Sequence, residues 1–343
     1  MILRETLARL SDLYGISGRE DAVRDFILKE IKPYCDSVEV ISTGSIIAHK
    51  KGKVPAAHKL MLCAHMDEVG MIVTDINENG LLKFATVGGI DRRVLCGTAV
   101  LVGDDKLPGV IGAKPIHMLE GDERDKAPEV KDLYIDIGAL SKEEAMEKVL
   151  PGDDVVFDTK FGEFGDGLLK GKALDDRAGC AVLMEILKRD LPCDLWFVFS
   201  AMEEVGLRGA KCAAFSVAPD MAIVVESTTA ADIPNVDNCA QVCQVGKGAV
   251  VSFMDRTTIY DRGMLKMAQR VAQERGIAWQ FKRGVTGGND AGTIHNSRGG
   301  VRTAAVSLPC RYLHSPCGVI AESDLNAVCE LVWGLAEKAA LSQ

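Results

Sequence analysis

At 343 residues, with 47% hydrophobic and 26% charged residues, the chain has the composition of an ordinary folded globular protein and not that of a disordered, collagen-like or coiled-coil one. Its formal net charge of -9 argues against a nucleic-acid-binding protein, because affinity for phosphate backbones depends on clustered Lys and Arg. No stretch of the sequence is long and apolar enough to predict a membrane span.

The N-terminal segment and the cysteines indicate a cytoplasmic protein. The charged residues Arg4, Glu5 and Arg9 interrupt the apolar run that a secretory signal would need. The 11 cysteines are scattered along the chain, are odd in number and lack the paired C-x-x-C spacing of a zinc knuckle. We therefore interpret them as reduced and mostly buried thiols.

The first part of the chain predicts helices followed by strands. Apolar residues at helical spacing predict helices over 2–13 and 19–32, with the turn Ile-Ser-Gly-Arg-Glu between them. Strand-like runs follow at 38–42, 45–50 and 59–65. The last run is continuously apolar, which indicates a buried strand of a central sheet. His65 ends this run, at the edge where open α/β sheets place their active sites.

Residues 69–165 have a different pattern, in which short strand-like segments are separated by Gly, Asp and Pro. These segments cover 70–76, 80–89, 98–103, 109–115 and 153–161. Short strands with frequent turn residues predict a small β-rich domain inserted in the chain.

The alternation of helices and strands resumes after the insert. We expect helices over 176–189, 207–216, 261–275 and 322–340, and strands over 194–200, 221–227, 250–254, 279–285 and 303–309. The sequence therefore predicts an α/β fold with one mixed sheet between helices. Residues 1–68 and 166–343 form this domain, and the β-rich insert at 69–165 interrupts it.

Two histidines stand at positions typical of functional residues. His65 and Asp67 are two residues apart after a strand, and side chains at this spacing on an extended segment point the same way, so Asp67 can orient the imidazole. His314 follows an apolar run and precedes a Pro turn. A lone histidine is more often structural than a ligand, so each of them requires partners.

Adjacent acids provide candidate partners. Asp175 and Asp176 lie at a Gly-flanked turn that enters a helix, where they repel each other unless a cation or a helix cap relieves them. An N-cap followed by a first-turn acid is an equally good interpretation. Glu203 and Glu204 follow an apolar strand, which suits one metal ligand and one proton carrier, although an isolated pair is usually solvated.

The combination indicates a metal site. Glu226 lies at the exit of another strand. Histidines and carboxylates drawn from separate strand ends supply the mixed nitrogen and oxygen ligands that zinc, cobalt and manganese accept. A shared carboxylate can hold two ions roughly 3.5 to 4 Å apart, as in two-metal hydrolases.

With these segments in this order, the sequence resembles the tetrahedral (TET) aminopeptidases, also known as glutamyl or deblocking aminopeptidases, some of which carry endoglucanase names. The resemblance runs almost end to end and rests on the motifs ISGRE, AHMDEVGMIV, GKALDDRAG, SAMEEVGLRGA, ESTTAADIP, GGNDAG and RYLHSP. An ordered series of this kind is highly specific.

The resemblance implies a role for each candidate residue. Asp175 corresponds to a carboxylate that bridges two divalent metal ions, zinc or cobalt with manganese as a further candidate. His65 and Glu226 complete one metal site, and Glu204 and His314 complete the other. Asp67 is the orienting acid, and Glu203 is the general base that takes a proton from a bridging water and delivers it to the leaving amine. In GGNDAG, Gly288 and Asp290 either line the substrate pocket or form a capped glycine turn.

The resemblance also implies the architecture and the substrates. The fold would be an α/β/α catalytic domain like that of zinc peptidases, with an inserted barrel-like or PDZ-like β domain for dimerisation and substrate access. Dimers of such proteins build up to a hollow tetrahedral dodecamer. The activity would be the removal of N-terminal residues from short peptides.

Two positions depart from the family pattern. Glu226 stands where relatives often carry Asp, which alters the geometry or affinity of one metal position. Gly318 stands where an acidic residue is common, which weakens any inference about interactions beyond the ligands.

Three other functions compete with the aminopeptidase. A metal-dependent amidohydrolase acting on acyl-amino acids would use the same ligands. An endoglucanase is disfavoured, because glycosidases usually need two carboxylates without a metal and the chain has only 5% aromatic residues. A scaffold without catalysis would lack a ligand or the base, and every expected position is filled.

Overall fold

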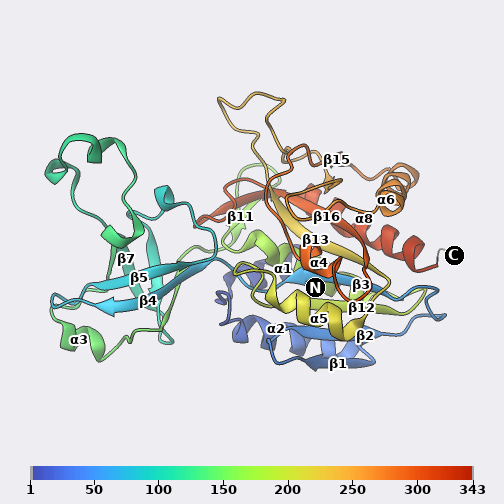
Figure 1. Cartoon of the computed structure of the whole chain (residues 1–343), viewed down its shortest axis with the longest axis horizontal. Coiled ribbons are helices and arrows are strands. Elements are labelled where there is room, and N and C mark those ends of the chain that lie inside the picture. The colour runs from blue at the N-terminus through green and yellow to red at the C-terminus, as the bar shows by residue number, and fades with distance from the viewer. Residues whose placement is uncertain (1–2, 342–343) are drawn as a thin grey trace.

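The computed structural model describes residues 3–341, which form a main domain built around one large sheet and a smaller barrel beside it (Figure 1). The main sheet has 8 strands, in the spatial order β1 (Ser37–Val40), β2 (Ile46–Lys50), β12 (Leu195–Ser200), β3 (Leu60–His65), β13 (Met221–Thr229), β16 (Arg302–Cys310), β14 (Ala249–Val251) and β15 (Trp279–Phe281). The predicted mixed α/β fold is confirmed.

The central strands share one direction. β3 is parallel to both β12 and β13, and β13 is parallel to β16. Every residue of β3 is buried, which explains why its sequence is continuously apolar. The carboxyl ends of these strands therefore meet at one edge of the sheet, where His65 ends β3 as predicted.

Helices cover both faces of the sheet, which gives three layers. One face packs on α1 (Leu3–Asp12), α2 (Asp21–Ile31), α4 (Leu174–Lys188), α6 (Arg262–Arg275) and α8 (Glu322–Leu341), and the other on α5 (Arg208–Val217) and α7 (Ala291–Ile294). Alternate residues of β12 point to opposite faces, because Phe197 and Phe199 join the first core while Val198 joins the second. Along residues 3–341 there is no helix that has both the length and the apolar character needed to cross a membrane.

The inserted domain is a closed barrel, which stands at the left of Figure 1. Its strands are, in order around the barrel, β4 (Gly70–Ile76), β5 (Leu82–Val87), β8 (Tyr134–Asp136), β7 (Leu107–Gly112), β6 (Ala99–Val102) and β9 (Asp154–Phe157). Inward-pointing side chains such as Met71, Phe84 and Val155 form a core separate from that of the main domain. The short helix α3 (Lys142–Met146) packs its Ala145 against this core.

The remaining elements are a small sheet and short 3-10 segments. A small sheet of β10 (Gly162–Glu163), β11 (Leu168–Gly171) and β17 (Gly318–Ala321) lies after the barrel returns to the main domain. Single 3-10 turns are η1 (Lys32–Tyr34), η2 (Arg92–Val94), η3 (Ile116–Met118), η4 (Gly121–Asp125) and η5 (Val130–Asp132). Residue 2, where the first predicted helix begins, lies outside the described residues.

Candidate metal centre

Asp175 lies between the two histidines. Its Oδ1 is 3.3 Å from Nε2 of His65, and its Oδ2 is 3.2 Å from Nε2 of His314. The two side chains that it joins come from the end of β3 and from the segment that follows β16. Asp175 therefore offers one oxygen to each histidine, which is the arrangement that a shared carboxylate requires.

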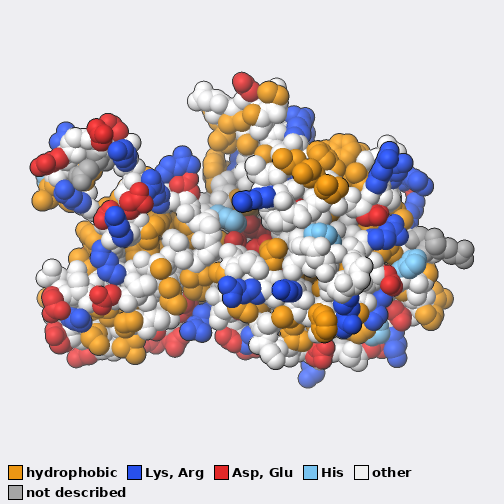
Figure 2. Space-filling model, viewed as in Figure 1, with side chains coloured by type: hydrophobic (Ala, Val, Ile, Leu, Met, Phe, Trp, Pro, Cys, Tyr) orange, Lys and Arg blue, Asp and Glu red, His pale blue; other side chains and the backbone are white. Residues whose placement is uncertain are grey.

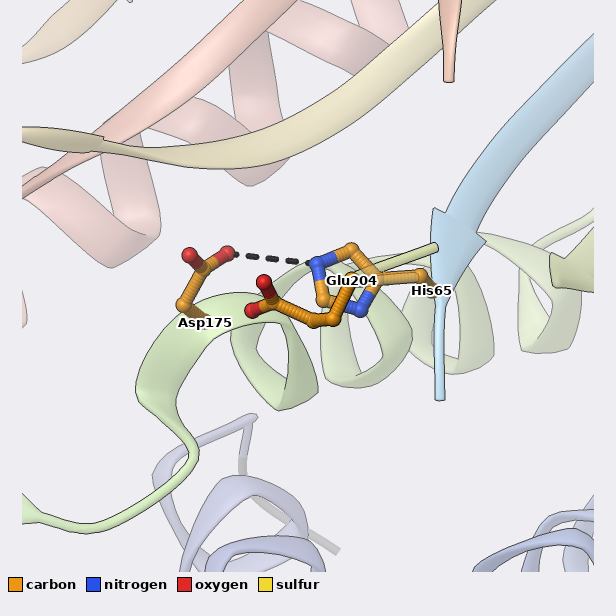
Figure 3. A group of neighbouring side chains, drawn as sticks. All are labelled: His65, Asp175 and Glu204. Atoms are coloured by element: carbon orange, nitrogen blue, oxygen red, sulfur yellow. Dashed lines mark ion pairs between the residues drawn. The ribbon is translucent and has the colours of Figure 1, made fainter. Parts of the chain in front are cut away.

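Each histidine also has a second carboxylate. Glu226 of β13 places Oε1 3.4 Å from Nε2 of His65. Glu204 places Oε1 3.2 Å from Nε2 of His314. Figure 3 shows the carboxylates of Asp175 and Glu204 beside the ring of His65, and the three form a group whose ligand atoms lie within 4.8 Å of one another. All five residues expected as ligands are thus brought together.

Asp67 holds both His65 and the turn that carries the glutamates. Its Oδ1 is 3.4 Å from Nδ1 of His65, the ring nitrogen that faces away from Asp175. The backbone N–H groups of Glu203 and Glu204 donate to Oδ1 and Oδ2 of Asp67 at 3.0 and 3.1 Å. The hydroxyl of Ser17 donates to the same carboxylate. A carboxylate with this many donors stays ionised, and the pKa of Asp67 is lowered although burial opposes the shift.

The turn between β12 and α5 receives support that sequence reasoning did not find. Met202 adopts a left-handed backbone with φ 56°, and its N–H donates to Oε1 of Glu20 at 3.0 Å. Glu20 is 3% exposed and also accepts the N–H of Gly18. Ser17 and Glu20 both belong to the turn before α2. This turn therefore supports the segment that carries Glu203 and Glu204, through a hydrogen bond between residues 182 positions apart in the sequence. The motif ISGRE contains Ser17 and Glu20, but the sequence does not indicate which residues they contact.

Asp175 and Asp176 have different surroundings. Both have non-helical dihedral angles at the start of α4. Oδ1 of Asp176 accepts the N–H of Gly179 at 2.9 Å, which is a capping contact for the helix. Asp176 also forms a second possible metal group with His65 and Glu226. Asp175 is the one of the two that contacts both histidines. The helix-cap interpretation therefore applies to Asp176, and the metal-ligand interpretation applies to Asp175.

The pKa values of the site residues are shifted, because several carboxylates lie around two histidines. Burial alone would lower the pKa of His314, but hydrogen bonds to Asp175 and Glu204 outweigh it and raise the pKa to about 11. Burial raises the pKa of Glu226 to about 8 and raises that of Glu203 well above its ordinary value. The cluster of negative charge therefore holds protons that a cation would replace.

These residues fit a bound divalent cation. Oδ1 of Asp175 is buried and accepts no hydrogen bond from any described residue, despite its distance of 3.3 Å from His65. A buried carboxylate oxygen without a donor is rare in proteins and is explained by a missing ion or water. Imidazole with carboxylate is a donor set that zinc, cobalt and manganese accept.

Two cavities meet at this cluster and share Asp175, Leu313 and His314. The smaller is about 20 Å³ and is lined by Glu204 and, at the base of the barrel, by Val69 and Phe157. The larger is about 260 Å³ and includes Glu203, His65 and Glu226. Glu203 and Glu204 therefore open onto different cavities. Figure 2 shows a hollow near the middle of this face, with acidic and histidine side chains between the barrel and the main domain.

Two further predicted positions have clear surroundings. Gly288 lines the larger cavity, whereas Asp290 is not among its lining residues and accepts the hydroxyl of Ser200 beneath the strand ends. Gly318 begins β17, and a Cβ at this position would lie 2.9 Å from Sγ of Cys310. That closeness gives a steric reason for the glycine.

Comparisons with known proteins agree with this arrangement. The model of the M42 glutamyl aminopeptidase family matches residues 44–331. A protein of Acetivibrio thermocellus that is named as an aminopeptidase by assignment is similar to this chain. The two are 38% identical over 335 residues, which cover 96% of each chain. The lysyl aminopeptidase of Pyrococcus furiosus is 30% identical over 347 residues, which cover 98% of each chain.

Solved structures are similar over nearly the whole chain. A TET aminopeptidase from a marine sediment archaeon of the Thaumarchaeota has a TM-score of 0.94 and 35% identity, with 99% of this chain and 97% of that chain covered. The TET1 peptidase of Pyrococcus horikoshii, described as able to assemble into a tetrahedron or a large octahedral shell, has a TM-score of 0.85 and 35% identity, with 99% and 100% covered. Because the family model spans most of the sequence and these relatives align with almost all of it, the chain belongs to the M42 aminopeptidase family of metal-dependent peptide-bond hydrolases.

Proposed function

We propose that the protein is a two-metal aminopeptidase that removes single N-terminal residues from short peptides. The observation that carries this proposal is the position of Asp175, with one oxygen 3.3 Å from His65 and the other 3.2 Å from His314. One metal position would be held by His65, Asp175 and Glu226, and the other by His314, Asp175 and Glu204. Family membership supports the peptide substrate, and the donor set supports zinc, cobalt or manganese.

Two bound cations would supply a water of lowered pKa and a polarised scissile carbonyl. Proton transfer and ligand positioning would be carried out by residues of the chain. Glu203 opens onto the larger cavity beside His65, while Glu204 faces the smaller one. We assign Glu203 as the general base, which accepts the proton of the attacking water and then delivers it to the leaving amine. Burial raises the pKa of Glu203 well above its ordinary value, which suits a carboxylate that must accept and return a proton near neutral pH.

Asp67 acts through other residues. It faces Nδ1 of His65 and receives the N–H groups of Glu203 and Glu204. We assign it as the orienting acid, which keeps Nε2 of His65 directed at the ligand cluster and fixes the glutamate turn. The dense negative charge also favours a substrate with a free α-amino group, which supports removal of one residue at a time.

Assembly and location follow as parts of the same proposal. We propose that residues 69–165 act as the dimerisation and substrate-access domain and that dimers build a tetrahedral dodecamer, because the similar TET1 peptidase is described as forming a tetrahedron. The barrel strands β4 to β9 lie inside this range. We also propose a cytoplasmic location, because exposed Cys96, Cys212 and Cys239 are free thiols, as a reducing compartment keeps them.

The test is a peptide panel. The purified protein is reconstituted with zinc, cobalt or manganese and incubated with tripeptides that have a free or an acetylated N-terminus, and with a soluble cellulose derivative. We expect stepwise release of amino acids from free N-termini only, abolished by a chelator and restored by added metal. Cleavage of acetylated substrates would favour the acyl-amino-acid amidohydrolase instead. No cleavage of any peptide with any metal would contradict the proposal.

A further inference from the structure

Asp290 is a buried acid outside both cavities of the metal centre. Its side chain is 1% exposed, and it lines neither the smaller nor the larger cavity. Oδ1 of Asp290 is buried and accepts no hydrogen bond from any residue in the described range 3–341. Within that range, Oδ1 of Asp175 is the one other buried side-chain oxygen or nitrogen without a hydrogen bond. A buried oxygen without a donor destabilises the fold, so its presence requires an explanation other than stability.

Asp290 does not cap the helix that follows it. It stands at the N-cap position of α7, but its side chain forms no capping hydrogen bond there. The neighbouring Asn289 has this role, because its Oδ1 accepts the N–H of Ala291 at 2.9 Å. Nδ2 of Asn289 in turn donates to the hydroxyl of Tyr260 at 3.0 Å. The capped-turn interpretation of the GGNDAG motif therefore applies to Asn289 and does not explain the carboxylate of Asp290.

The carboxylate of Asp290 contacts two strands of the main sheet. Its Oδ2 accepts the hydroxyl of Ser200, the last residue of β12, and lies 3.7 Å from Sγ of Cys63 in β3. Cys63 belongs to the core on the face that α7 covers, and so does Val198, two residues before Ser200. The period of two along a strand therefore directs Ser200 to the same face as Cys63. One carboxylate oxygen serves both strands, and the other is left without a donor.

These two strand ends carry residues of the metal centre. Ser200 is opposite His65, the last residue of β3, whose ring lies in the ligand cluster (Figure 3). The hydroxyl of Ser200 also lies 3.3 Å from the carbonyl oxygen of Ala64, and the carbonyl of Ser200 accepts the N–H of Met66 at 2.7 Å. Glu203 follows three residues after Ser200. A displacement of Ser200 would therefore move the histidine and the glutamate turn relative to each other.

We propose that Asp290 is a positioning residue of the metal centre, which fixes the end of β12 against the end of β3 through Ser200 and Cys63. It thereby sets the distance between His65 and the turn that carries the two glutamates. Asp67 holds the same histidine and the same turn beyond the strand ends, whereas Asp290 acts from the face that α7 covers. This inference rests on the proposed two-metal function and adds to it a residue that lies outside both cavities.

The experiment removes the contact from either side. We expect Asp290→Ala and Ser200→Ala each to lower kcat on a tripeptide, at saturating cobalt, by about 10- to 100-fold, as for other residues that orient metal ligands. KM should change little, because neither side chain lines the cavities. The absorption bands of the cobalt-loaded protein should shift in both variants, since they report the geometry of the ligands. The double variant should be no slower than the slower single variant, because both substitutions remove the same contact.

A conservative variant and a distant control separate positioning from folding. Asp290→Asn keeps an oxygen that can accept from Ser200, so it should keep most of kcat and the cobalt bands of the wild type. Asp261→Ala removes the side-chain cap of α6 and the partner of Arg302, the first residue of β16. It should lower the melting temperature without changing kcat or the cobalt bands. If Asp290→Ala does not fold, Ser200→Ala, which removes one hydroxyl, still tests the contact.

Several results would overturn the inference. Wild-type kcat and cobalt bands in both alanine variants would do so, as would effects that multiply in the double variant, because the contact would then not be shared. A rise in KM with unchanged kcat would mean that Asp290 acts on the substrate. An equal loss of kcat in Asp261→Ala would assign the effects to stability. If the wild-type protein cuts no peptide with any metal, the proposed function fails, and the cobalt bands and the affinity for zinc still test the position of His65.

Discussion

The carboxylate of Asp67 accepts the backbone N–H of Glu203 at 3.0 Å, so the residue that faces His65 also fixes the position of the residue that we assign as the base. Asp67 has 0% exposure and lies behind the ligand cluster, not in it. The histidine and the glutamate turn are thereby held by one side chain, although they end different strands of the sheet.

Replacement of Asp67 by Asn should weaken metal binding with little change in the fold. An amide cannot accept from all the donors that Asp67 receives, and its NH2 group would face the N–H groups of Glu203 and Glu204. We expect the affinity for zinc to fall by about 10- to 100-fold, as for other residues that orient metal ligands. Competition with a chromophoric chelator measures the affinity. Asp25→Asn, on the exposed side of α2, is the matched control, and equal affinities in the two variants would refute the role of Asp67.

Replacement of Glu203 and of Glu204 by Gln should have different consequences. Glu203 opens onto the larger cavity, so Glu203→Gln should lower kcat by about 10²- to 10⁴-fold and keep the metal content of the wild type. Glu204 lies 3.2 Å from His314, so Glu204→Gln should lose metal from that half of the centre. Elemental analysis together with single-turnover kinetics separates the effects. Metal loss in Glu203→Gln with full metal in Glu204→Gln would mean that the roles are exchanged.

Metal affinity should rise with pH. In the metal-free protein, burial opposes a charged His314, but hydrogen bonds to Asp175 and Glu204 raise its pKa from 6.5 to about 11. A metal binds neutral imidazole, so loading near neutral pH must displace this proton. The same raised pKa stabilises the metal-free fold fully below pH 6.5, and this contribution is lost as the pH rises toward 11.

Calorimetry in buffers of different ionisation enthalpy measures the protons released on zinc binding. We expect tighter binding at about pH 8 than at about pH 6, with proton release that falls in His314→Gln. Affinity that is independent of pH, without proton release, would contradict this prediction.

The junction between the domains depends on a buried ion network. Glu68 lies 2.8 Å from Lys172 and 3.3 Å from Arg177, and all three side chains are almost fully buried. Glu68→Gln leaves the two cations without their counter-charge and should reduce the free energy of unfolding by about 3 to 5 kcal/mol. Urea denaturation measures this loss. Glu163→Gln, which removes the exposed partner of Arg4, should leave the midpoint unchanged, and equal midpoints for both variants would refute the importance of the network.

Sequence periodicity predicted the central elements well and their ends less well. The run at 59–65 corresponds to β3, because a strand buried on both faces is continuously apolar. The strands expected over 250–254 and 279–285 end early, at Val251 and Phe281. Asp255 accepts the N–H groups of Thr257 and Thr258 and so turns the chain, and Arg283 bonds to the carbonyl of Val242 in another segment. Such partners do not appear in a local pattern.

The candidate site was predictable as a set of residues but not as a network. The order of the motifs predicted His65, Asp175 and His314 as site residues, and the structure brings them together. The roles of Ser17 and Glu20 depend on contacts that span 50 and 182 residues, respectively.

The closed barrel limits how the inserted domain can meet another molecule. β4 pairs with both β5 and β9, so the ring of strands has no free edge at which a foreign strand could be added by backbone hydrogen bonds. In the main sheet, by contrast, β1 and β15 are terminal strands. Any association through the barrel must therefore be encoded in side chains, such as the exposed Ile116 and Met118, and surface substitutions there can change partner choice without disturbing the strands beneath.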